Sequence, residues 1–341
     1  MKNKLTIRLA LLIVCALSIN TTFAQDVRQK PIIKKQTTTT KKKQTPASTK
    51  KQTSTKKHQT TTPKWTDQLY YSEGLAPVVD ANGKFGYIDK TGKFVIPGQW
   101  KYAEDFHEGL ARVKDFNDKC GYIDKTGQIV IPCKWKDALW FSEGLASVQD
   151  NNGKVGYIDQ TGRLVIPCQW KYAGHFSEGL APVVDANGKF GYIDKTGKVV
   201  IPGQWKYALW FSEGLAPVVD DNDKLGFIDK TGKLVIPFKW NWAGDFREGL
   251  APVQDANDKW GFIDKTGKLV SPCQWKGAGD FSEGLARVQD ANDKYGFINK
   301  MGKVIIPCQW KDAWSFTEGL AKVMDANGNW FKIDKTGKVV E

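Results

Sequence analysis

The chain has 341 residues, 12% of them aromatic, and a formal net charge of +13. This charge does not lie on the part that can fold. Residues 25–64 hold twelve Lys or Arg against the single acid Asp26, whereas residues 65–341 hold 35 basic and 36 acidic residues. Nucleic-acid-binding domains carry their basic patch on the folded module, so the composition argues against nucleic acid as the partner.

Residues 1–24 have the layout of a secretory signal peptide. Lys2, Lys4 and Arg8 precede an apolar run over 9–17, and Ala24 ends a segment with small residues. The run is shorter than the ~20 apolar residues that span a bilayer. We therefore expect export to a periplasmic or extracellular location, envelope-associated or free, with no transmembrane segment after cleavage. A retained N-terminal anchor is the alternative.

Residues 25–64 consist mainly of Lys, Thr, Gln, Pro and Ser. Such a segment buries too little apolar surface to offset its ordering entropy, so we expect a disordered basic linker. It is either a plain spacer or a tether that contacts anionic polymers or lipid headgroups of the envelope.

Residues 65–341 contain one motif eight times at a constant spacing of 35 residues. A tryptophan keeps this spacing from Trp65 to Trp310. A fixed period of this length indicates a solenoid, a propeller or an array. The glycine of a Glu-Gly-Leu motif recurs at Gly74, Gly109, Gly144, Gly179, Gly214, Gly249, Gly284 and Gly319.

Turn signals divide each unit into short β-prone runs. Asn82-Gly83 predicts a hairpin, because both residues tolerate positive φ. Gly92 suits the left-handed position of a type I turn with a bulge. These turns predict a β-meander with strands over 75–79, 85–89 and 94–96.

The segment after each tryptophan is less clear. Trp100, Ala103 and Phe106 lie three residues apart, which favours one turn of 3₁₀ or α-helix with a single apolar side. A short fourth strand is the alternative.

One unit alone should not fold, because ordering 35 residues outweighs the burial of its few apolar side chains. Neighbouring units must cover one another. We therefore expect an all-β tandem array of eight meander units in an elongated solenoid or superhelix. A closed propeller-like ring is the alternative, although common propeller repeats have ~40–45 residues. The side chains expected to be buried are Leu75, Val78, Tyr87, Ile88, Val95, Ile96, Trp100 and Phe106.

Four cysteines occupy one register of the repeat, where other units have Gly or Phe. This exchange favours small, half-buried apolar side chains. Disulfides between adjacent units are the alternative, because an oxidising compartment would permit them. The pairs would be Cys133–Cys168 and Cys273–Cys308, with Cys120 left over.

The segment 258–270, Asp-Lys-Trp-Gly-Phe-Ile-Asp-Lys-Thr-Gly-Lys-Leu-Val, and Glu-Gly-Leu-Ala-Pro-Val at 248–253 resemble the bacterial WG-repeat (KWG-repeat) family. The resemblance covers residues 65–341, although the Trp-Gly pair is intact only at Trp260-Gly261. It implies a β-rich repeat array that serves as an interaction module, and it supplies no catalytic residues.

The recurrent acids are interpreted as structural. Asp80 and Asp89 each begin a tight turn, where a carboxylate can accept backbone N–H groups. Lys84 occupies the next ligand position of a calcium-type loop, and the loop has no glutamate at its twelfth position, which argues against calcium. We expect no catalytic residue, metal site or cofactor, and the recurrent tryptophans are expected in the core.

Binding should use positions that vary while their neighbours stay constant. These are the two residues before each recurrent Phe: Glu104-Asp105, Leu139-Trp140, Gly174-His175, Leu209-Trp210, Gly244-Asp245 and Trp314-Ser315. Exposed indoles can stack on sugar rings or anchor proteins. Chance surface variation is the alternative. The candidate ligand-binding residues are Tyr70, Trp140, Trp210, Trp242, Trp260 and Trp314.

These patterns favour an exported, non-enzymatic binding or scaffold protein whose extended repeat surface recognises a protein. Binding of a carbohydrate or cell-wall polymer through exposed aromatics is the alternative function.

Overall fold

The computed structural model describes residues 69–340, which contain strands and turns but no helix. The expected signal peptide (1–24), the basic linker (25–64) and Trp65 lie outside these residues. The described chain forms two compact units, 69–153 with 158–164 and 154–157 with 165–340.

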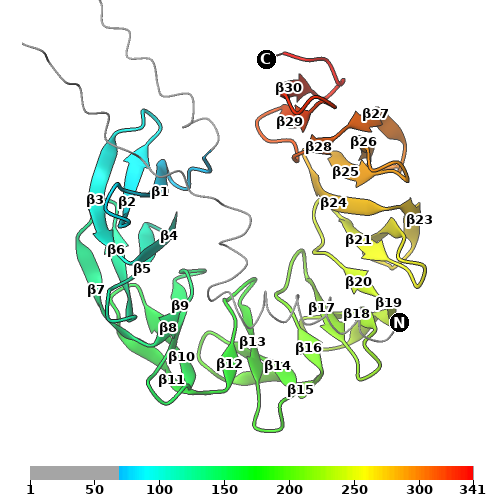
Figure 1. Ribbon diagram of the computed structural model, residues 1–341. Coiled ribbons are helices and arrows are strands. Elements are labelled where there is room, and N and C mark those ends of the chain that lie inside the picture. Colours follow the sequence, from blue (N-terminus) through cyan, green and yellow to red (C-terminus); the bar gives the residue numbers. More distant parts are fainter. Residues whose placement is uncertain (1–68, 341) are drawn as a thin grey trace, which may run out of the picture. The chain divides into compact units, whose positions relative to one another are not determined.

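Each repeat forms one antiparallel sheet whose strands pair in chain order (Figure 1). The first sheet has three strands, β1 (Leu75–Val79), β2 (Phe85–Asp89) and β3 (Phe94–Trp100). The later sheets are β4 (Tyr102–His107), β5 (Leu110–Lys114), β6 (Cys120–Asp124) and β7 (Ile129–Trp135); β8 (Asp137–Ala138), β9 (Leu145–Gln149), β10 (Val155–Asp159) and β11 (Leu164–Trp170); β12 (Tyr172–Ala173), β13 (Leu180–Val184), β14 (Phe190–Asp194) and β15 (Val199–Trp205); β16 (Tyr207–Ala208), β17 (Leu215–Val219), β18 (Leu225–Asp229) and β19 (Leu234–Trp240); β20 (Trp242–Ala243), β21 (Leu250–Gln254), β22 (Trp260–Asp264) and β23 (Leu269–Trp275); β24 (Gly277–Ser282), β25 (Leu285–Gln289), β26 (Tyr295–Asn299) and β27 (Val304–Trp310); and β28 (Asp312–Ala313), β29 (Leu320–Met324) and β30 (Trp330–Asp334).

The prediction of an all-β tandem array of meander units is confirmed. The helical turn expected after each tryptophan is wrong, and the alternative of a short fourth strand is correct. Tyr102 pairs with Lys114 and Ala103 with Val113, and a register shift then follows before Phe106. This shift places Ala103 and Phe106 in the same buried cluster, which explains why their spacing resembles a helix.

The tightest turn joins the first and second strands of the four-stranded sheets, and in the three-stranded first sheet it precedes β1. Ser72 and Leu75 exchange two backbone hydrogen bonds of 3.0 Å, and the residues between them, Glu73 and Gly74, have φ of 50° and 90°. Positive φ at both central residues defines a type I′ turn. The sequence therefore places a glutamate in a backbone conformation that normally favours Gly, Asn or Asp.

The other two turns are alike. Gly83 donates its N–H to the carbonyl of Asp80 at 3.1 Å, and Gly92 donates to Asp89 at 2.9 Å. Gly83 and Gly92 have φ of 76° and 81°, whereas Asn82 is not among the residues with positive φ. The hairpin at Asn82-Gly83 is thus confirmed, the positive φ expected at Asn82 is wrong, and the left-handed Gly92 is confirmed.

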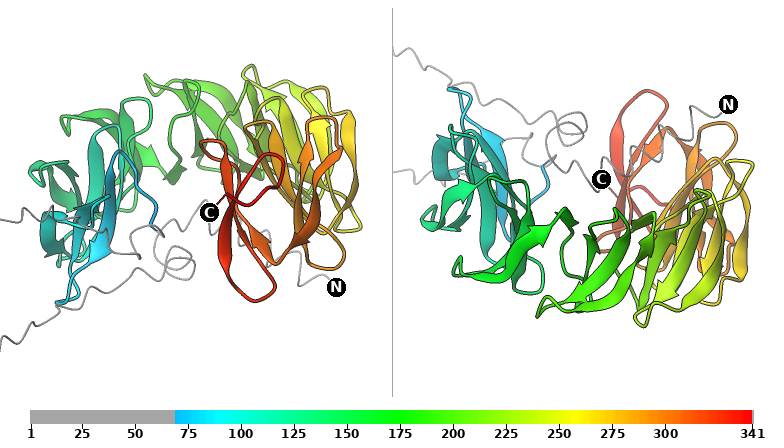
Figure 2. Two further views of the ribbon diagram at one scale, coloured as in Figure 1. Left: turned by 90° about the horizontal axis from the view of Figure 1, so that it is seen from above. Right: turned by 90° about the horizontal axis from the view of Figure 1, so that it is seen from below.

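Both faces of a sheet are buried because successive sheets of a unit pack face to face (Figures 1 and 2). Tyr87 and Trp100 of the first sheet pack against Phe106 and Val113 of the next. Large side chains on one face therefore meet a face of smaller ones. Of the eight side chains expected to be buried, Val95 is the exception at 42% exposed, because it lies on the edge strand β3.

A tyrosine hydroxyl ties neighbouring sheets together. Tyr87 donates to the carbonyl of Glu104 at 2.6 Å, and Tyr192 donates to that of Leu209 at 2.7 Å. Each tyrosine ring also packs against the next recurrent Phe, as in Tyr87 and Phe106, whose ring centroids are 4.9 Å apart. The contact between neighbouring sheets therefore combines aromatic packing with one hydrogen bond.

The glycine of the Trp-Gly motif is required by close backbone packing. A Cβ added at Gly191 would lie 2.4 Å from the carbonyl oxygen of Ile201, where strand β15 bulges over β14. The equivalent residue of the last sheet is Phe331 on β30. No described strand pairs with β30 on that side beyond the single bridge Ile333–Val339, so a large side chain is accommodated there.

Candidate functional site

The first strands of successive sheets lie along one edge within each unit, because every four-stranded sheet pairs in the same order. We call this the variable edge. It consists of the residue pairs before each recurrent Phe: Glu104-Asp105, Leu139-Trp140, Gly174-His175, Leu209-Trp210, Gly244-Asp245, Gly279-Asp280 and Trp314-Ser315. Gly279-Asp280 was absent from the predicted set, although its position in the repeat would have identified it.

Several second residues of these pairs contact a side chain of the neighbouring repeat. The ring centroids of His175 and Trp210 are 4.9 Å apart, and the Trp210 indole N–H donates to Asp245 Oδ2 at 2.9 Å. In the other unit, the rings of His107 and Trp140 stack at 5.5 Å. The structure thus brings two of the predicted binding residues, Trp140 and Trp210, into half-buried contacts rather than leaving them isolated.

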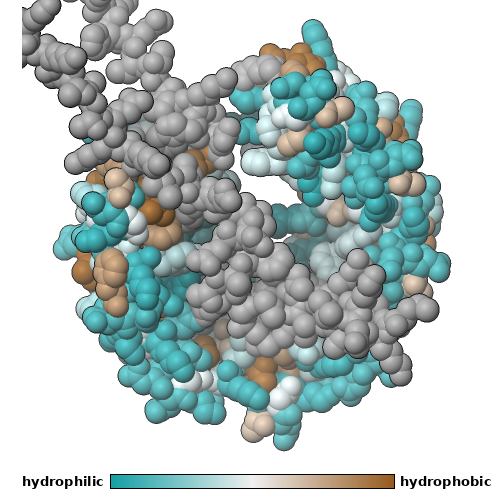
Figure 3. Space-filling view, in the orientation of Figure 1, coloured by the Kyte–Doolittle hydropathy of each residue, from teal (hydrophilic) through white to brown (hydrophobic). Residues whose placement is uncertain are grey.

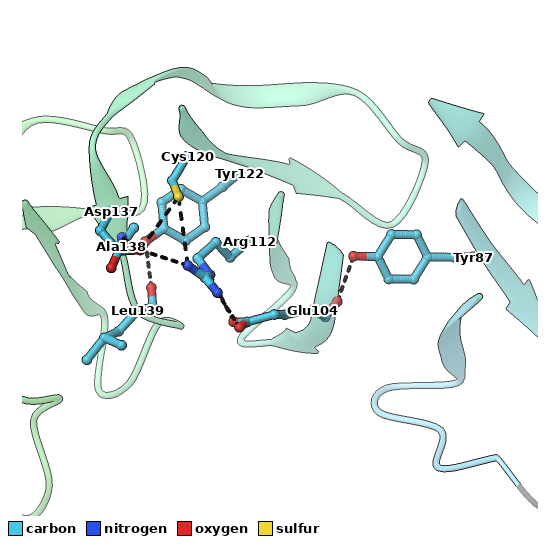
Figure 4. A network of polar contacts seen from close by, with 8 residues as sticks. All are labelled: Tyr87, Glu104, Arg112, Cys120, Tyr122, Asp137, Ala138 and Leu139. Carbon is cyan, nitrogen blue, oxygen red and sulfur yellow. Dashed lines mark hydrogen bonds and ion pairs between the residues drawn. The ribbon is translucent and has the colours of Figure 1, made fainter. Parts of the chain in front are cut away.

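The first residue of each pair packs against the second strand of its own sheet. Arg112 is only 3% exposed; it forms an ion pair with Glu104 and a 3.0 Å ion pair with Asp137 of the following sheet (Figure 4). The Cys120 thiol lies 3.7 Å from the same guanidinium. Figure 4 shows this network between Tyr87 and Tyr122, which each donate to a backbone carbonyl. It is a buried contact between sheets.

The same packing explains other substitutions at the first position. A Cβ at Gly244 would lie 2.8 Å from Pro252 Cγ, so this site excludes a side chain. Gly279 faces Arg287 instead, and the guanidinium extends to the carbonyl of Ala313 and lies 5.1 Å from the Tyr295 ring. The packing partner thus accounts for Glu104 and bears on Gly244, whereas Leu209 carries a side chain opposite Pro217. Sequence reasoning missed that partner, whose signal is the replacement of Pro77 by Arg, Ser or Lys in other units.

Two carboxylates of the variable edge have unusual surroundings. Burial raises the pKa of Asp245, although the hydrogen bond from Trp210 opposes this shift. Burial also raises the pKa of Asp280, whose carboxylate lies 3.3 Å from Arg247 Nε. These acids keep a proton more readily than exposed aspartates do.

The other predicted binding residues lie in different surroundings. Tyr70 is 66% exposed. Trp242 and Trp260 belong to one sheet and pack at 4.9 Å between centroids, both half-buried. Trp314 is 49% exposed and pairs at 5.7 Å with Trp330, which is 42% exposed and was not predicted.

Of the recurrent tryptophans in residues 69–340, Trp100, Trp240 and Trp275 are buried, which confirms their assignment to the core, and the other four are half-buried. The indole N–H of Trp275 donates to Ser271 Oγ at 3.3 Å. Ser271 is fully buried where the other units have isoleucine. The buried indole N–H has no hydrogen-bond partner among residues 69–340 at Trp100, Trp135, Trp170, Trp205, Trp240 and Trp310.

The recurrent aspartates have the predicted structural role. Asp80 Oδ1 accepts the backbone N–H groups of Asn82 and Lys84 at 2.8 and 2.9 Å. Asp89 Oδ1 likewise accepts those of Thr91 and Lys93. Both carboxylates are therefore occupied by their own turns.

Within the described chain, none of the five cysteines is joined in a disulfide, so neither alternative pair is formed. Cys120 is buried, and burial raises the pKa of Cys133 to about 11, which keeps this thiol protonated. Across residues 69–340, no three His, Cys, Asp or Glu side chains are grouped to hold a metal. The same residues include no helix with the length and apolar character that a membrane span requires.

A family model described as WG containing repeat matches residues 85–120, 121–154, 156–190, 190–224, 226–260, 260–295 and 295–330. The chain belongs to the WG-repeat family. This confirms the resemblance seen in the sequence. The matched segments begin in the next-to-last strand of a sheet, so their boundaries differ from those of the folded sheets.

No curated protein matches the chain. Among solved structures, the computationally designed Ika8 protein is similar, with a TM-score of 0.49 and 12% identity over 78% of this chain and 95% of that one. BamB from Moraxella catarrhalis has a TM-score of 0.47 and 12% identity over 78% of this WG-repeat chain and 96% of its own.

Proposed function

We propose that this WG-repeat protein is an exported, non-enzymatic binding or scaffold protein that recognises a protein partner along the variable edge. The observation that carries the proposal is a contrast between two sets of residues. The residues of the variable edge differ from repeat to repeat, whereas those that hold neighbouring turns together are constant. The residues at the second position are Asp105, Trp140, His175, Trp210, Asp245, Asp280 and Ser315. The Glu-Gly pairs that begin with Glu73-Gly74 and hold neighbouring turns together are the same in all eight repeats.

The chemistry of the edge suits a protein surface. Tryptophan and arginine dominate the energetic centres of protein interfaces, and Trp140, Trp210 and Arg247 lie on or beside the edge. The predicted signal peptide supports export, and the +11 linker supports a salt-sensitive contact with anionic envelope polymers.

Carbohydrate or cell-wall binding is the second candidate, favoured by the half-buried aromatic pairs His175–Trp210 and Trp242–Trp260. A pyranose can stack on an indole face that remains open.

The full chain and two variants test these functions by capture of partners from an envelope extract. Trp210→Ser changes the variable edge, and Val200→Ser changes the opposite edge as a matched control. We expect a captured protein to bind at least tenfold more weakly to Trp210→Ser and unchanged to Val200→Ser. Equal loss in both variants contradicts the proposal.

Co-sedimentation with peptidoglycan or soluble polysaccharide separates the second candidate. Retention that persists at high salt, with a change in tryptophan fluorescence that Trp210→Ser abolishes, would replace the protein partner by a sugar. A hydrolytic activity that one substitution abolishes would overturn both.

A further inference from the structure

One edge of the sheet β28–β29–β30 lacks a complete partner strand. The backbone N–H of Val340 donates to the carbonyl of Lys332 at 2.9 Å, which begins a pairing like that of a fourth strand. Within residues 69–340, no strand continues this pairing along β30 towards Trp330. An unpaired strand presents backbone N–H and C=O groups to which a strand of another chain can add. The outer edge of β30 therefore needs protection.

In the inner sheets, the fourth strand covers this edge and crosses over the glycine of the Trp-Gly motif. A Cβ added at Gly226, Gly261 or Gly296 would lie 2.6, 2.6 or 2.5 Å from a backbone carbonyl oxygen of that strand. These distances are shorter than van der Waals contact, so a side chain would displace the strand. None of these three glycines has a positive φ. Space, rather than backbone conformation, therefore requires glycine at this position.

Phe331 occupies the glycine position on β30. It pairs with Val323, as Gly296 pairs with Val288 in the preceding sheet. A fourth strand in the usual register would have to cross the Phe331 Cβ, at the place where the other sheets leave no room for one. The pairing of β29 with β30 is regular throughout. The side chain therefore obstructs only the outer edge.

The Phe331 ring also fills a place that the fourth strand fills in other sheets. Cys273 and Cys308, on the fourth strands β23 and β27, pack against the clusters that join their sheets to the preceding ones. Phe331 packs against the equivalent cluster, which contains Phe297 and Phe316. One side chain thus replaces an apolar contact of the fourth strand and blocks the strand that would supply it.

We propose that Phe331 closes the outer edge of β30 to the addition of a further β-strand. Natural sheets carry features at their edges that prevent pairing with another chain. Here the Cβ is sufficient, because the glycine position has no room for it beneath a fourth strand. The ring adds the packing that keeps the three-stranded sheet in place. This device does not depend on binding at the variable edge.

An earlier repeat supplies the strand for a test. Residues 197–200, Gly-Lys-Val-Val, have the same sequence as residues 337–340, and residues 201–205 complete the fourth strand β15. The full chain is extended after Val340 with a copy of residues 201–205 in place of Glu341. The extension is made in the wild type, in Phe331→Ala and in Phe331→Gly. Amide hydrogen exchange over β30 then reports whether the added strand pairs.

We expect the extension to slow exchange over β30 about tenfold in Phe331→Gly and to leave it unchanged in the wild type and in Phe331→Ala. Phe331→Ala is the matched control, because it lacks the ring but keeps the Cβ. Each extended chain is compared with its own unextended form, so a stability loss from removing the ring affects both. Slower exchange in the extended wild type or Phe331→Ala overturns the proposal, and so does unchanged exchange in Phe331→Gly.

The reverse substitution tests the same geometry in a sheet that has its fourth strand. Gly296→Ala places a Cβ 2.5 Å from the carbonyl oxygen of Ile306 on β27. We expect exchange over β27 to become about tenfold faster than in the wild type, while β25, on the far side of β26, stays protected. Unchanged exchange over β27 would show that a Cβ at this position does not exclude a strand, and it would overturn the proposal whatever the stability of Phe331→Gly.

Discussion

The carboxylate of Glu178 accepts a hydrogen bond of 3.0 Å from the backbone N–H of Gly214, one repeat further along the chain. Lys230 adds an ion pair to the same carboxylate at 3.1 Å. Glu178 itself has φ of 54°, so the strained residue of one type I′ turn binds the next turn. Asparagine would tolerate this φ better, but its side chain is too short for both contacts. The same hydrogen bond joins five other pairs, which together with Glu178–Gly214 we call the glutamate ladder. These pairs are Glu73–Gly109, Glu108–Gly144, Glu213–Gly249, Glu248–Gly284 and Glu283–Gly319.

Replacing Glu178 by asparagine should therefore destabilise the protein although it relieves backbone strain. We expect a loss of about 1 kcal/mol in the free energy of unfolding, the usual contribution of one hydrogen bond. Urea unfolding followed by tryptophan fluorescence measures it. Glu318→Asn is the matched control, because Glu318 has the same φ of 54° but its carboxylate binds no following turn among the described residues. Equal losses in both variants would refute the ladder.

The glutamate ladder should also make stability depend on pH. The hydrogen bond from Lys125 lowers the pKa of Glu73 below its ordinary value of 4.5, and Lys335 does the same for Glu283. A lowered pKa in the folded state means that the stabilisation is complete above the ordinary pKa and disappears as the pH falls through the lowered one. The wild type should lose more melting temperature between pH 5 and pH 3 than the double variant Glu73→Gln/Glu283→Gln. Parallel profiles would contradict this.

Much of the fold follows from the spacing of turn residues. Gly83 and Gly92 marked both hairpins of the meander, because their positions require positive φ. The short first strand was harder to predict, since Ala103 and Phe106 share a face only through a register shift. The sequence did not predict the type I′ turn at Glu73-Gly74, because this glutamate is stabilised by a contact with the next repeat rather than by its own neighbours.

The candidate site was predictable in part. Trp140 and Trp210 were identified because they occupy a position of the repeat whose residue varies while its neighbours stay the same. Both lie on the variable edge. This variation did not reveal that Glu104 forms an ion pair with Arg112, because the two residues lie on different strands and only the sheet brings them into contact. It also missed Trp330, which lies on β30 and is 42% exposed.

The tyrosine hydroxyl between sheets can be tested by exchange with the phenylalanine that other repeats contain. Tyr192→Phe removes the donor to the carbonyl of Leu209 and should cost about 1–2 kcal/mol of unfolding free energy. Phe227→Tyr places a hydroxyl in the equivalent position, facing the carbonyl of Gly244, and should be neutral or stabilising. Denaturant unfolding checks both. Destabilisation by Phe227→Tyr would show that the sheets around it cannot accommodate the hydroxyl.

The glycine of the Trp-Gly motif should tolerate no side chain in the inner sheets. A Cβ at Gly226 would lie 2.6 Å from the carbonyl oxygen of Ile236. Gly226→Ala should therefore force the bulge of β19 away and lower the melting temperature by several degrees, corresponding to more than about 2 kcal/mol. Phe331→Ala, in the same register of the last sheet, should have a smaller effect. A mild Gly226→Ala variant would mean that the motif glycine is not required by packing.

Asp245 should destabilise the folded protein at neutral pH, unlike the ladder glutamates. Its pKa is raised chiefly by burial, and Asp280 nearby adds to the shift. A raised pKa means that the folded state holds the proton more tightly, so stability falls as the pH rises through the ordinary value of 3.8 and towards the raised one. Asparagine keeps an oxygen that can accept the Trp210 N–H, but it carries no charge.

Asp245→Asn should therefore melt at a higher temperature than the wild type at pH 7.5, and the difference should shrink at pH 3. Thermal unfolding at the two pH values measures it, with the exposed Asp221→Asn as a control whose effect has the opposite sign, because Lys189 lowers the pKa of Asp221. A less stable Asp245→Asn at pH 7.5 would mean that the charged hydrogen bond to Trp210 outweighs the burial of the carboxylate. In that case the edge is held rigid by this bond, and Trp210→Phe should be equally destabilising.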